Sequence, residues 1–290
     1  MSDRADRIPP LPEPLPAEVV DNHCHLDIPG SARDHDADPT RDLEVTELLQ
    51  RAASVGVPRA VQISYDLPSA RWTVQAIEQH PELLGGVALH PNEGPRLAAE
   101  GGFEAFEVAF DEIEKLAEHP RVRVIGETGL DYFRTGPEGR LVQQESFRRH
   151  IALAKRLDLT MQIHDRDAHA DVLRILAEEG APKRTVFHCF SGDVAMAREC
   201  VERGYYLSFA GNVTFKNAQP LRDALAVTPL DQLQIETDAP YLTPAPYRGR
   251  PNASYLVPLT ARAMADVLQV DVRTLCEQAV STSQRLYGQW

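Results

Sequence analysis

Histidines and carboxylates recur at the ends of short apolar runs in this 290-residue sequence, and these residue types can bind metal ions. Five of the ten histidines occupy such positions, and three acidic residues join them: His23, His25, His90, His164, His188, Glu127, Glu236 and Asp238. Imidazole nitrogens and carboxylate oxygens are common ligands of divalent ions in hydrolytic centres. The pattern therefore predicts a metal site, with enough ligands for two ions.

The elements that must position these residues are short β-rich runs that alternate with amphipathic runs. Strands are expected at Glu18–Val20, Arg59–Ser64, Leu84–Leu89, Val122–Gly126, Leu159–Ile163, Thr185–Phe187, Tyr205–Phe209 and Leu233–Glu236. Helices are expected at Thr40–Ser54, Ser69–His80, Phe103–Glu118, Leu141–Arg156, Ala168–Glu179, Val194–Arg203, Ala218–Ala226, Ala253–Leu268 and Val272–Leu286. This alternation predicts an α/β fold, the (β/α)8 TIM barrel, as a single domain. A doubly wound sheet is the alternative, but its first strand usually leads into a glycine-rich turn, where this chain has Asn22–His25.

In such a barrel the chemistry lies at the C-terminal ends of the strands. Side chains alternate between the two faces of a strand, so His23 and His25 share one face while Cys24 points the other way. The same alternation directs four further side chains into the barrel: His164, His188, Glu236 and Asp238. These groups are therefore expected to converge at one end of the barrel.

Each of these residues alone has a simpler explanation. Histidines spaced as His23 and His25 could be polar strand-end residues satisfied by backbone groups. Glu127 could accept hydrogen bonds within its Gly-Glu-Thr-Gly turn, and Asp238 could cap a helix. Their joint occurrence at the ends of several predicted strands favours the metal site.

The composition excludes several classes of protein. Hydrophobic residues make up 43% of the chain, acidic residues outnumber basic ones by 43 to 30, and the formal net charge is −13. This balance argues against a disordered chain, a fibrous protein and a cationic protein that coats nucleic acid through bulk charge. The proline-rich residues 1–18 are expected to form a tail or a surface strap, ahead of a domain that spans residues 19–290.

The ends and the cysteines of the sequence indicate a compartment. The N-terminus lacks the basic start and apolar core of a secretory signal, and no apolar run approaches the roughly 20 residues that span a bilayer. The four cysteines lie far apart and form no C-x-x-C pair. These features predict reduced thiols and a cytoplasmic location, with no membrane partner and no obligate protein partner.

Several motifs resemble those of the TatD family of metal-dependent DNases, within the amidohydrolase-like superfamily. The matching stretches are Asp21–Asp27, Ala88–Pro91, Gly126–Tyr132, Phe187–Gly192 and Glu236–Leu242. The resemblance runs from about residue 19 to the C-terminus. It implies a (β/α)8 hydrolase that acts on phosphodiesters, typically as an exonuclease on single-stranded DNA ends. The stretch before His90 and the acidic insert Ser31–Pro39 depart from the family pattern and could alter substrate access.

The resemblance also implies roles for individual residues. The metal ligands would be His23, His25, Glu127 and Asp238 for one ion, and Glu127, His164 and His188 for a second. Glu127 would thus bridge two divalent ions, of Mg²⁺, Mn²⁺ or Zn²⁺, and Asp238 would accept the proton of the attacking water. Substrate contacts are expected from His90, Tyr132, Arg134, Lys216 and Arg248.

The substrate class follows mainly from this resemblance. Single-stranded DNA, or RNA, is the expected substrate, and the cations that follow predicted strand ends suit its phosphates. The alternative is an enzyme of the same architecture that acts on a small-molecule amide, lactone or nucleobase. A metal-stabilised binding protein without activity is a third alternative, which is disfavoured because no ligand of the set is missing.

Overall fold

The computed structural model describes residues 8–28 and 45–290 and confirms the predicted (β/α)8 barrel fold. One sheet contains eight strands in chain order: β1 (Val20–Cys24), β2 (Arg59–Ile63), β3 (Leu83–Val87), β4 (Val122–Asp131), β5 (Thr160–Arg166), β6 (Thr185–Phe187), β7 (Tyr206–Phe209) and β8 (Leu233–Ile235). The α-helices are α1 (Val45–Ser54), α2 (Leu67–Gln79), α3 (Glu93–Ala117), α4 (Pro137–Leu157), α5 (His169–Glu179), α6 (Val194–Glu202), α7 (Gln219–Ala226), α8 (Val257–Leu268) and α9 (Val272–Tyr287).

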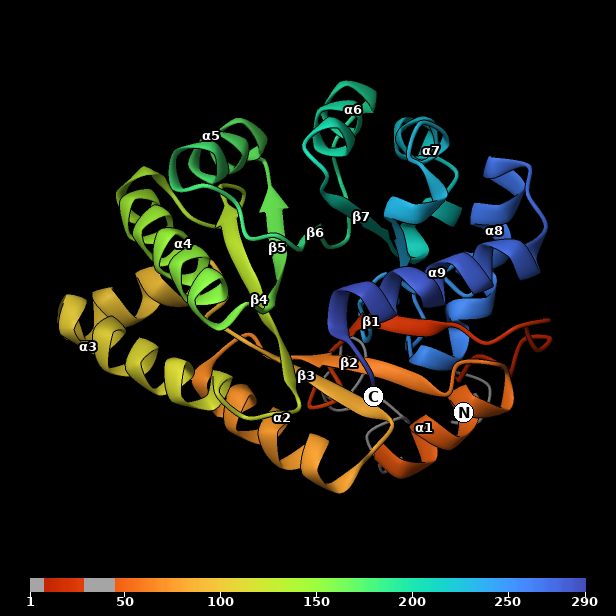
Figure 1. Ribbon diagram of the computed structural model, residues 1–290, viewed down its shortest axis with the longest axis horizontal. Coiled ribbons are helices and arrows are strands. Elements are labelled where there is room, and N and C mark those ends of the chain that lie inside the picture. The colour runs from red at the N-terminus through yellow and green to blue at the C-terminus, as the bar shows by residue number, and fades with distance from the viewer. Residues whose placement is uncertain (1–7, 29–44) are drawn as a thin grey trace, which may run out of the picture. The chain divides into compact units, whose positions relative to one another are not determined.

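Two compact units make up the chain. Unit 1 comprises residues 1–61 and 192–285, and unit 2 comprises residues 62–191 and 286–290. Figure 1 shows the elements of both, coloured along the chain. No helix in the described ranges is both long and apolar enough to cross a lipid bilayer.

In unit 1, β1 pairs with the segment that follows β8. The backbone N–H of His25 donates to the carbonyl of Ala239 at 2.8 Å, and Asp238 N–H donates to the carbonyl of His23 at 2.9 Å. The side chain of Asn22 is buried and donates to the carbonyl of Ile235 at 2.7 Å. These bonds explain why β1 differs from the predicted Glu18–Val20: its polar residues find partners inside the sheet, so the strand continues to Cys24.

The proline-rich segment of residues 8–19, here called the N-terminal strap, lies along unit 1. Leu15 N–H donates to the carbonyl of Val55 at 3.0 Å. The buried Tyr255 hydroxyl donates to the carbonyl of Pro9, and the Arg262 guanidinium donates to that of Pro14, both at 3.0 Å. Proline carbonyls remain acceptors although proline has no N–H, so a proline-rich segment can still be tied down by donors from helices.

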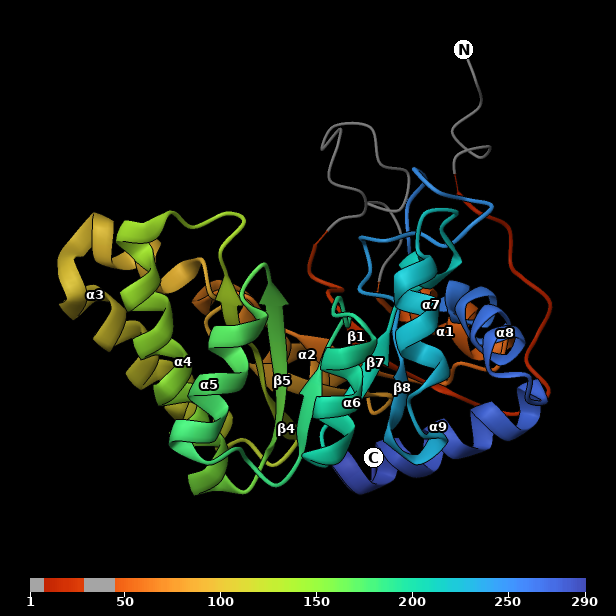
Figure 2. The same ribbon diagram turned by 90° about the horizontal axis from the view of Figure 1, so that it is seen from above.

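In unit 2, strands β3 to β6 pair in parallel, and Figure 2 shows β4 and β5 side by side. Both strands extend beyond their predicted ends, to Asp131 and Arg166, and these two residues are paired. The register shifts between Ile125 and Thr128. Gly129 has φ 140°, and a Cβ there would lie 2.1 Å from the carbonyl oxygen of His164, so only glycine lets the two strands run on together.

Helix α3 begins ten residues before the predicted Phe103, and α4 begins at Pro137 instead of Leu141. Inside α3 the backbone of Gly101 and Gly102 leaves the helical region, with φ 74° at Gly102. The predicted helix that begins at Phe103 therefore corresponds to the part of α3 after this break, and the part before it, which begins at Glu93, was not predicted. The predicted start of α1 at Thr40 lies outside the described residues, and the remaining predicted bounds differ from the observed ones by up to four residues.

A buried histidine links α4 to the end of β3. His150 Nδ1–H donates to the carbonyl of Ser146 at 2.7 Å, and its Nε2 accepts from the backbone N–H of Leu89 at 3.1 Å. The Phe110 ring packs edge-on against it, with centroids 4.9 Å apart. Burial lowers the pKa of His150 to about 4, although the bond to Ser146 acts in the opposite direction. The neutral ring therefore holds the backbone that leads to His90.

We predict that His150 makes unit 2 sensitive to mild acid. The unfolded chain takes up a proton near the usual histidine pKa, whereas the folded chain resists it, so stability is complete above that pKa and falls as the pH drops. By pH 5 the loss should be about 2 kcal/mol of unfolding free energy. Urea unfolding of the wild type and His150→Gln at pH 7.5 and pH 5 measures it. The wild type should lose more stability than the variant, and equal losses would contradict the assignment.

Candidate functional site

The structure brings His23, His25 and Asp238 together in unit 1. The two Nε2 atoms of the histidines lie 3.2 Å apart. The Asp238 Oδ1 atom lies 3.6 Å from Nε2 of His25 and 3.9 Å from Nε2 of His23. Both imidazoles are buried, whereas 14% of the Asp238 side chain is exposed. Two imidazole nitrogens and one carboxylate oxygen thus face a common point that remains open to solvent at Asp238.

Asp21 holds the two strands that carry this cluster in register. Its carboxylate is fully buried and accepts from both the backbone N–H and the hydroxyl of Thr237, at 2.9 and 2.6 Å. Burial raises the pKa of Asp21 to about 6, although its hydrogen bonds with Thr237 lower it. Asp238 follows with φ 54°, a left-handed conformation that aspartate tolerates better than most residues. Asp21 therefore fixes the turn that aims Asp238 at the histidines.

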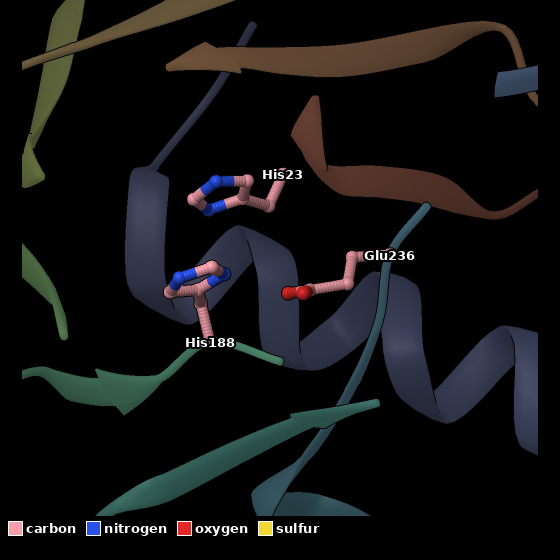
Figure 3. A group of neighbouring side chains, drawn as sticks. All are labelled: His23, His188 and Glu236. Carbon is pink, nitrogen blue, oxygen red and sulfur yellow. The ribbon is translucent and has the colours of Figure 1, made fainter. Parts of the chain in front are cut away.

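A further carboxylate, Glu236, lies beside this cluster. It is completely buried, accepts a hydrogen bond from the Ser208 hydroxyl, and has a ligand atom within 4.8 Å of one on His23. Figure 3 shows the carboxylate of Glu236, after β8, and the ring of His23, from β1; the third labelled residue, His188, follows β6 in unit 2. The sequence pattern predicts that Glu236 points inward and converges with the histidines, and its position beside His23 agrees with this.

In unit 2, Glu127 lies among three histidines from different strand ends. Its Oε2 atom lies 2.7 Å from Nε2 of His188 and 3.4 Å from Nδ1 of His164. Its Oε1 atom lies 3.7 Å from Nε2 of His90. The Glu127 carboxylate is nearly buried, and His90, Glu127 and His164 each offer a ligand atom within 4.8 Å of the others. His90, predicted as a substrate contact, therefore lies within reach of an ion held by this group.

The charge state of this group follows from its burial and its neighbours. Burial alone would raise the pKa of Glu127, but electrostatic interactions with His90 and His188 and hydrogen bonds from His164 and His188 hold it well below its usual value. Burial lowers the pKa of His90 to about 3, so this ring has its nitrogen lone pair available. An ionised carboxylate beside neutral imidazole is the donor chemistry that a divalent ion requires.

Asp131 is a supporting residue for which the sequence pattern predicts no role. Its Oδ2 atom lies 3.3 Å from Nε2 of His164, and its Oδ1 atom accepts from the backbone N–H of Arg134 at 2.8 Å. Asn92 and Gln143 continue the network: Asn92 donates to Asp131 Oδ2 at 3.4 Å, and Gln143 accepts from Asp131 N–H at 3.0 Å. A carboxylate behind a histidine fixes its orientation and basicity. Strand alternation could have indicated this role, because Asp131 lies an even number of residues beyond Glu127 and residues at even spacing share one face of a strand.

Both clusters fit divalent metal ions by their donor sets. Each combines imidazole nitrogens with a carboxylate oxygen, and their ligand atoms lie close enough to surround one ion. His23, His25 and Asp238 would hold an ion in unit 1. Glu127 and His164, assisted by His188 or His90, would hold one in unit 2.

Tyr132, predicted as a substrate contact, is already engaged on two sides. Its hydroxyl donates to Asp171 at 2.7 Å and accepts from Gln144 at 2.7 Å. The Arg140 guanidinium lies 4.2 Å above its ring. These contacts suit a residue that fixes the loop after β4.

The predicted cationic contacts Arg134, Lys216 and Arg248 are all exposed. Arg134 follows β4 in unit 2, where its backbone N–H is bound by Asp131. In unit 1, Arg248 stacks on the ring of Phe215 at 4.2 Å, next in sequence to Lys216. Each of these cations can therefore meet a solvent-borne ligand.

Comparisons with known proteins indicate a family for this chain. The profile of a family described as "TatD related DNase" matches residues 20–288. The "Uncharacterized metal-dependent hydrolase TatD" of Mycobacterium tuberculosis is 43% identical over 277 residues, which cover 93% of this chain and 98% of that protein. The "Uncharacterized metal-dependent hydrolase YabD" of Bacillus subtilis is 35% identical, covering 93% and 98%. The crystal structure of YJJV, a TatD homologue from Escherichia coli, shares the fold with a TM-score of 0.81 at 24% identity, covering 94% of this chain and 98% of that one.

We predict that the double variant His23→Ala, His25→Ala loses metal from unit 1 and keeps its fold. Ligands at strand ends serve the site, whereas the packed layers beneath them supply stability. Elemental analysis after dialysis should show less bound metal than in the wild type, and the circular dichroism spectrum should be unchanged. The matched control is His80→Ala, His119→Ala, which removes two histidines outside the clusters and should retain the wild-type metal content. Full metal content in the first variant would disprove the assignment.

Proposed function

Because this chain belongs to the TatD family of metal-dependent hydrolases, we propose that it is a deoxyribonuclease that hydrolyses phosphodiesters at single-stranded DNA ends. Divalent ions, when bound, supply Lewis acidity: they lower the pKa of a water molecule and offset the charge that develops on the phosphate. Two ions per chain are proposed, of Mg²⁺, Mn²⁺ or Zn²⁺. The four cysteines carry free thiols, which suits the proposed cytoplasmic location.

The protein groups would divide the work between binding and proton transfer. Asp238 is proposed to accept the proton of the attacking water, because its carboxylate is the partly exposed member of the unit 1 cluster. Glu127, whose two oxygens face different histidines, is proposed to hold the ion of the unit 2 cluster. The supporting bonds of Asp21 and Asp131 would hold these groups in place during the reaction.

The observation that favours a phosphodiester substrate is that exposed cations near the strand ends are not paired with carboxylates. Many arginines on the helix surfaces of unit 2 are paired with glutamates, as in Arg96–Glu100 and Arg156–Glu114. In contrast, within residues 8–28 and 45–290, no carboxylate forms an ion pair with Arg134, Lys216 or Arg248. In a chain of net charge −13, unpaired exposed cations are the groups that can bind an anion. A phosphate is the anion that the proposed reaction requires.

Digestion of end-labelled oligonucleotides tests this function. The purified protein, with its metal content measured, is incubated with single-stranded DNA, single-stranded RNA and blunt duplex, with and without chelator. We expect stepwise shortening of single-stranded DNA that chelator abolishes and added metal restores. Failure to cut any strand, together with hydrolysis of amides, lactones or nucleobases in a parallel panel, would replace the proposal with the small-molecule alternative.

We predict that Asp238→Asn lowers turnover more than it weakens substrate binding. The amide cannot accept a proton and is a weaker metal ligand than the carboxylate, so the loss should fall mainly on kcat, by about 100-fold or more. Steady-state kinetics on a labelled oligonucleotide measures kcat and KM separately. Near wild-type turnover in the variant would show that another group is the base.

We predict a shallow salt dependence of strand binding, because an acidic body offers few cations to phosphates. With a slope of about −0.7 per contacted phosphate, two or three contacts give a log–log slope of about −1.5 to −2. Fluorescence anisotropy with the Asp238→Asn variant and labelled single strands, over a series of salt concentrations, measures this slope. A slope steeper than about −5, or equal affinity for blunt duplex, would contradict the binding of a strand end.

A further inference from the structure

An exposed aromatic ring and an arginine are stacked beyond the metal cluster of unit 2. The Phe133 side chain, in the loop after β4, is 63% exposed. The guanidinium carbon of Arg166, at the end of β5, lies 3.9 Å from the centre of the Phe133 ring. Exposing a large apolar ring to water is unfavourable, so a flat group that covers the ring would recover part of that free energy.

Backbone contacts set the position of this pair. Asp131 is paired with Arg166 across the two strands, and Tyr132 N–H donates to the carbonyl of Arg166 at 2.9 Å. Arg166 lies two residues beyond His164 on the same strand, which corresponds to about 7 Å along it. The stacked pair therefore lies within the length of one nucleotide of His164, a proposed metal ligand, and of its supporting residue Asp131.

The charge of Arg166 is also available. Arginines on the neighbouring helices are neutralised: Arg148 pairs with Glu178 and Arg174 pairs with Asp171. Among the residues that the structure describes, no carboxylate forms an ion pair with Arg166, which is exposed and lies over the aromatic ring. A planar guanidinium that lies on an aromatic ring covers one face of that ring. An outer face of the stacked pair then remains open to a third flat group.

Phe133 differs from its neighbour Tyr132 in the contacts that its ring makes. The Tyr132 ring is covered by Arg140, and its hydroxyl is bound by Asp171 and Gln144. Phe133 has no polar group to bind, so its exposed surface can gain only by contact with another flat or apolar group.

From these observations we propose that Phe133 and Arg166 form a base-stacking subsite, which holds the nucleobase next to the phosphate at the unit 2 cluster. The proposal rests on the proposed nuclease function and adds to it a second recognition element besides phosphate charge. Stacking on an aromatic face tolerates every base, because each base has a π-face. The subsite therefore favours unpaired bases of any sequence over stacked bases within a duplex.

A thermodynamic cycle with an abasic strand tests the subsite. The probes are labelled single strands, either intact or with one abasic residue at the first or second position from either end. Dissociation constants are measured by fluorescence anisotropy in the Asp238→Asn background, so that the strands stay whole. The Asp238→Asn protein that retains Phe133 should bind the intact strand about tenfold more tightly than the abasic strand whose missing base would occupy the subsite. Adding Phe133→Leu should remove this difference, and adding Phe133→Tyr should preserve it.

The matched control is Val108→Ala, which trims a side chain of α3 that is 64% exposed and should leave the cycle unchanged. If the Phe133→Leu protein still prefers the intact strand by the same factor, the subsite proposal is wrong although the nuclease proposal stands. If the wild-type protein neither binds nor cuts single strands, the nuclease proposal itself fails. Intact strands that bind no more tightly than abasic strands in the Asp238→Asn background also overturn the subsite.

Discussion

The buried charge of Glu127 is the constraint on which the arrangement of unit 2 depends. An ionised carboxylate inside a protein costs several kcal/mol unless it is surrounded by positive or hydrogen-bonding groups. The chain meets this need from three other strand ends, which deliver His90, His164 and His188 around it. Asp131 then orients His164 from behind. A divalent ion would complete the same arrangement, since it replaces the protons that would otherwise have to neutralise the carboxylate.

Strand periodicity explains most of what could be predicted about the site. His23 and His25 lie two residues apart and reach the same cluster, whereas Cys24 between them is buried with its thiol 3.5 Å from the carbonyl of Val61. The alternation of strand faces depends only on local geometry, so a single sequence is enough to infer it. The predicted fold followed for the same reason, because each strand and helix carries its own apolar pattern.

The features that could not be predicted from the sequence depend on contacts between distant segments. Nothing local indicates that β1 continues through Asp21 and Asn22, since their polar side chains are satisfied by residues more than 200 positions away. Nor does the sequence indicate that Asp171 and Gln144 engage the Tyr132 hydroxyl, while Phe133 next to it stays exposed. Both outcomes are decided by which partners the folded chain brings near, and hydrophobicity patterns carry no information about that.

The N-terminal strap has a consequence for how the protein is made. The strap binds Tyr255 and Arg262, and unit 1 as a whole combines two segments that lie far apart in the sequence. A ribosome releases the strap long before Tyr255 and Arg262, whereas most of unit 2 is one continuous stretch. Vectorial synthesis thus allows unit 2 to begin folding on the ribosome. The strap must remain undocked, and open to nascent-chain factors, until Tyr255 and Arg262 have left the exit tunnel.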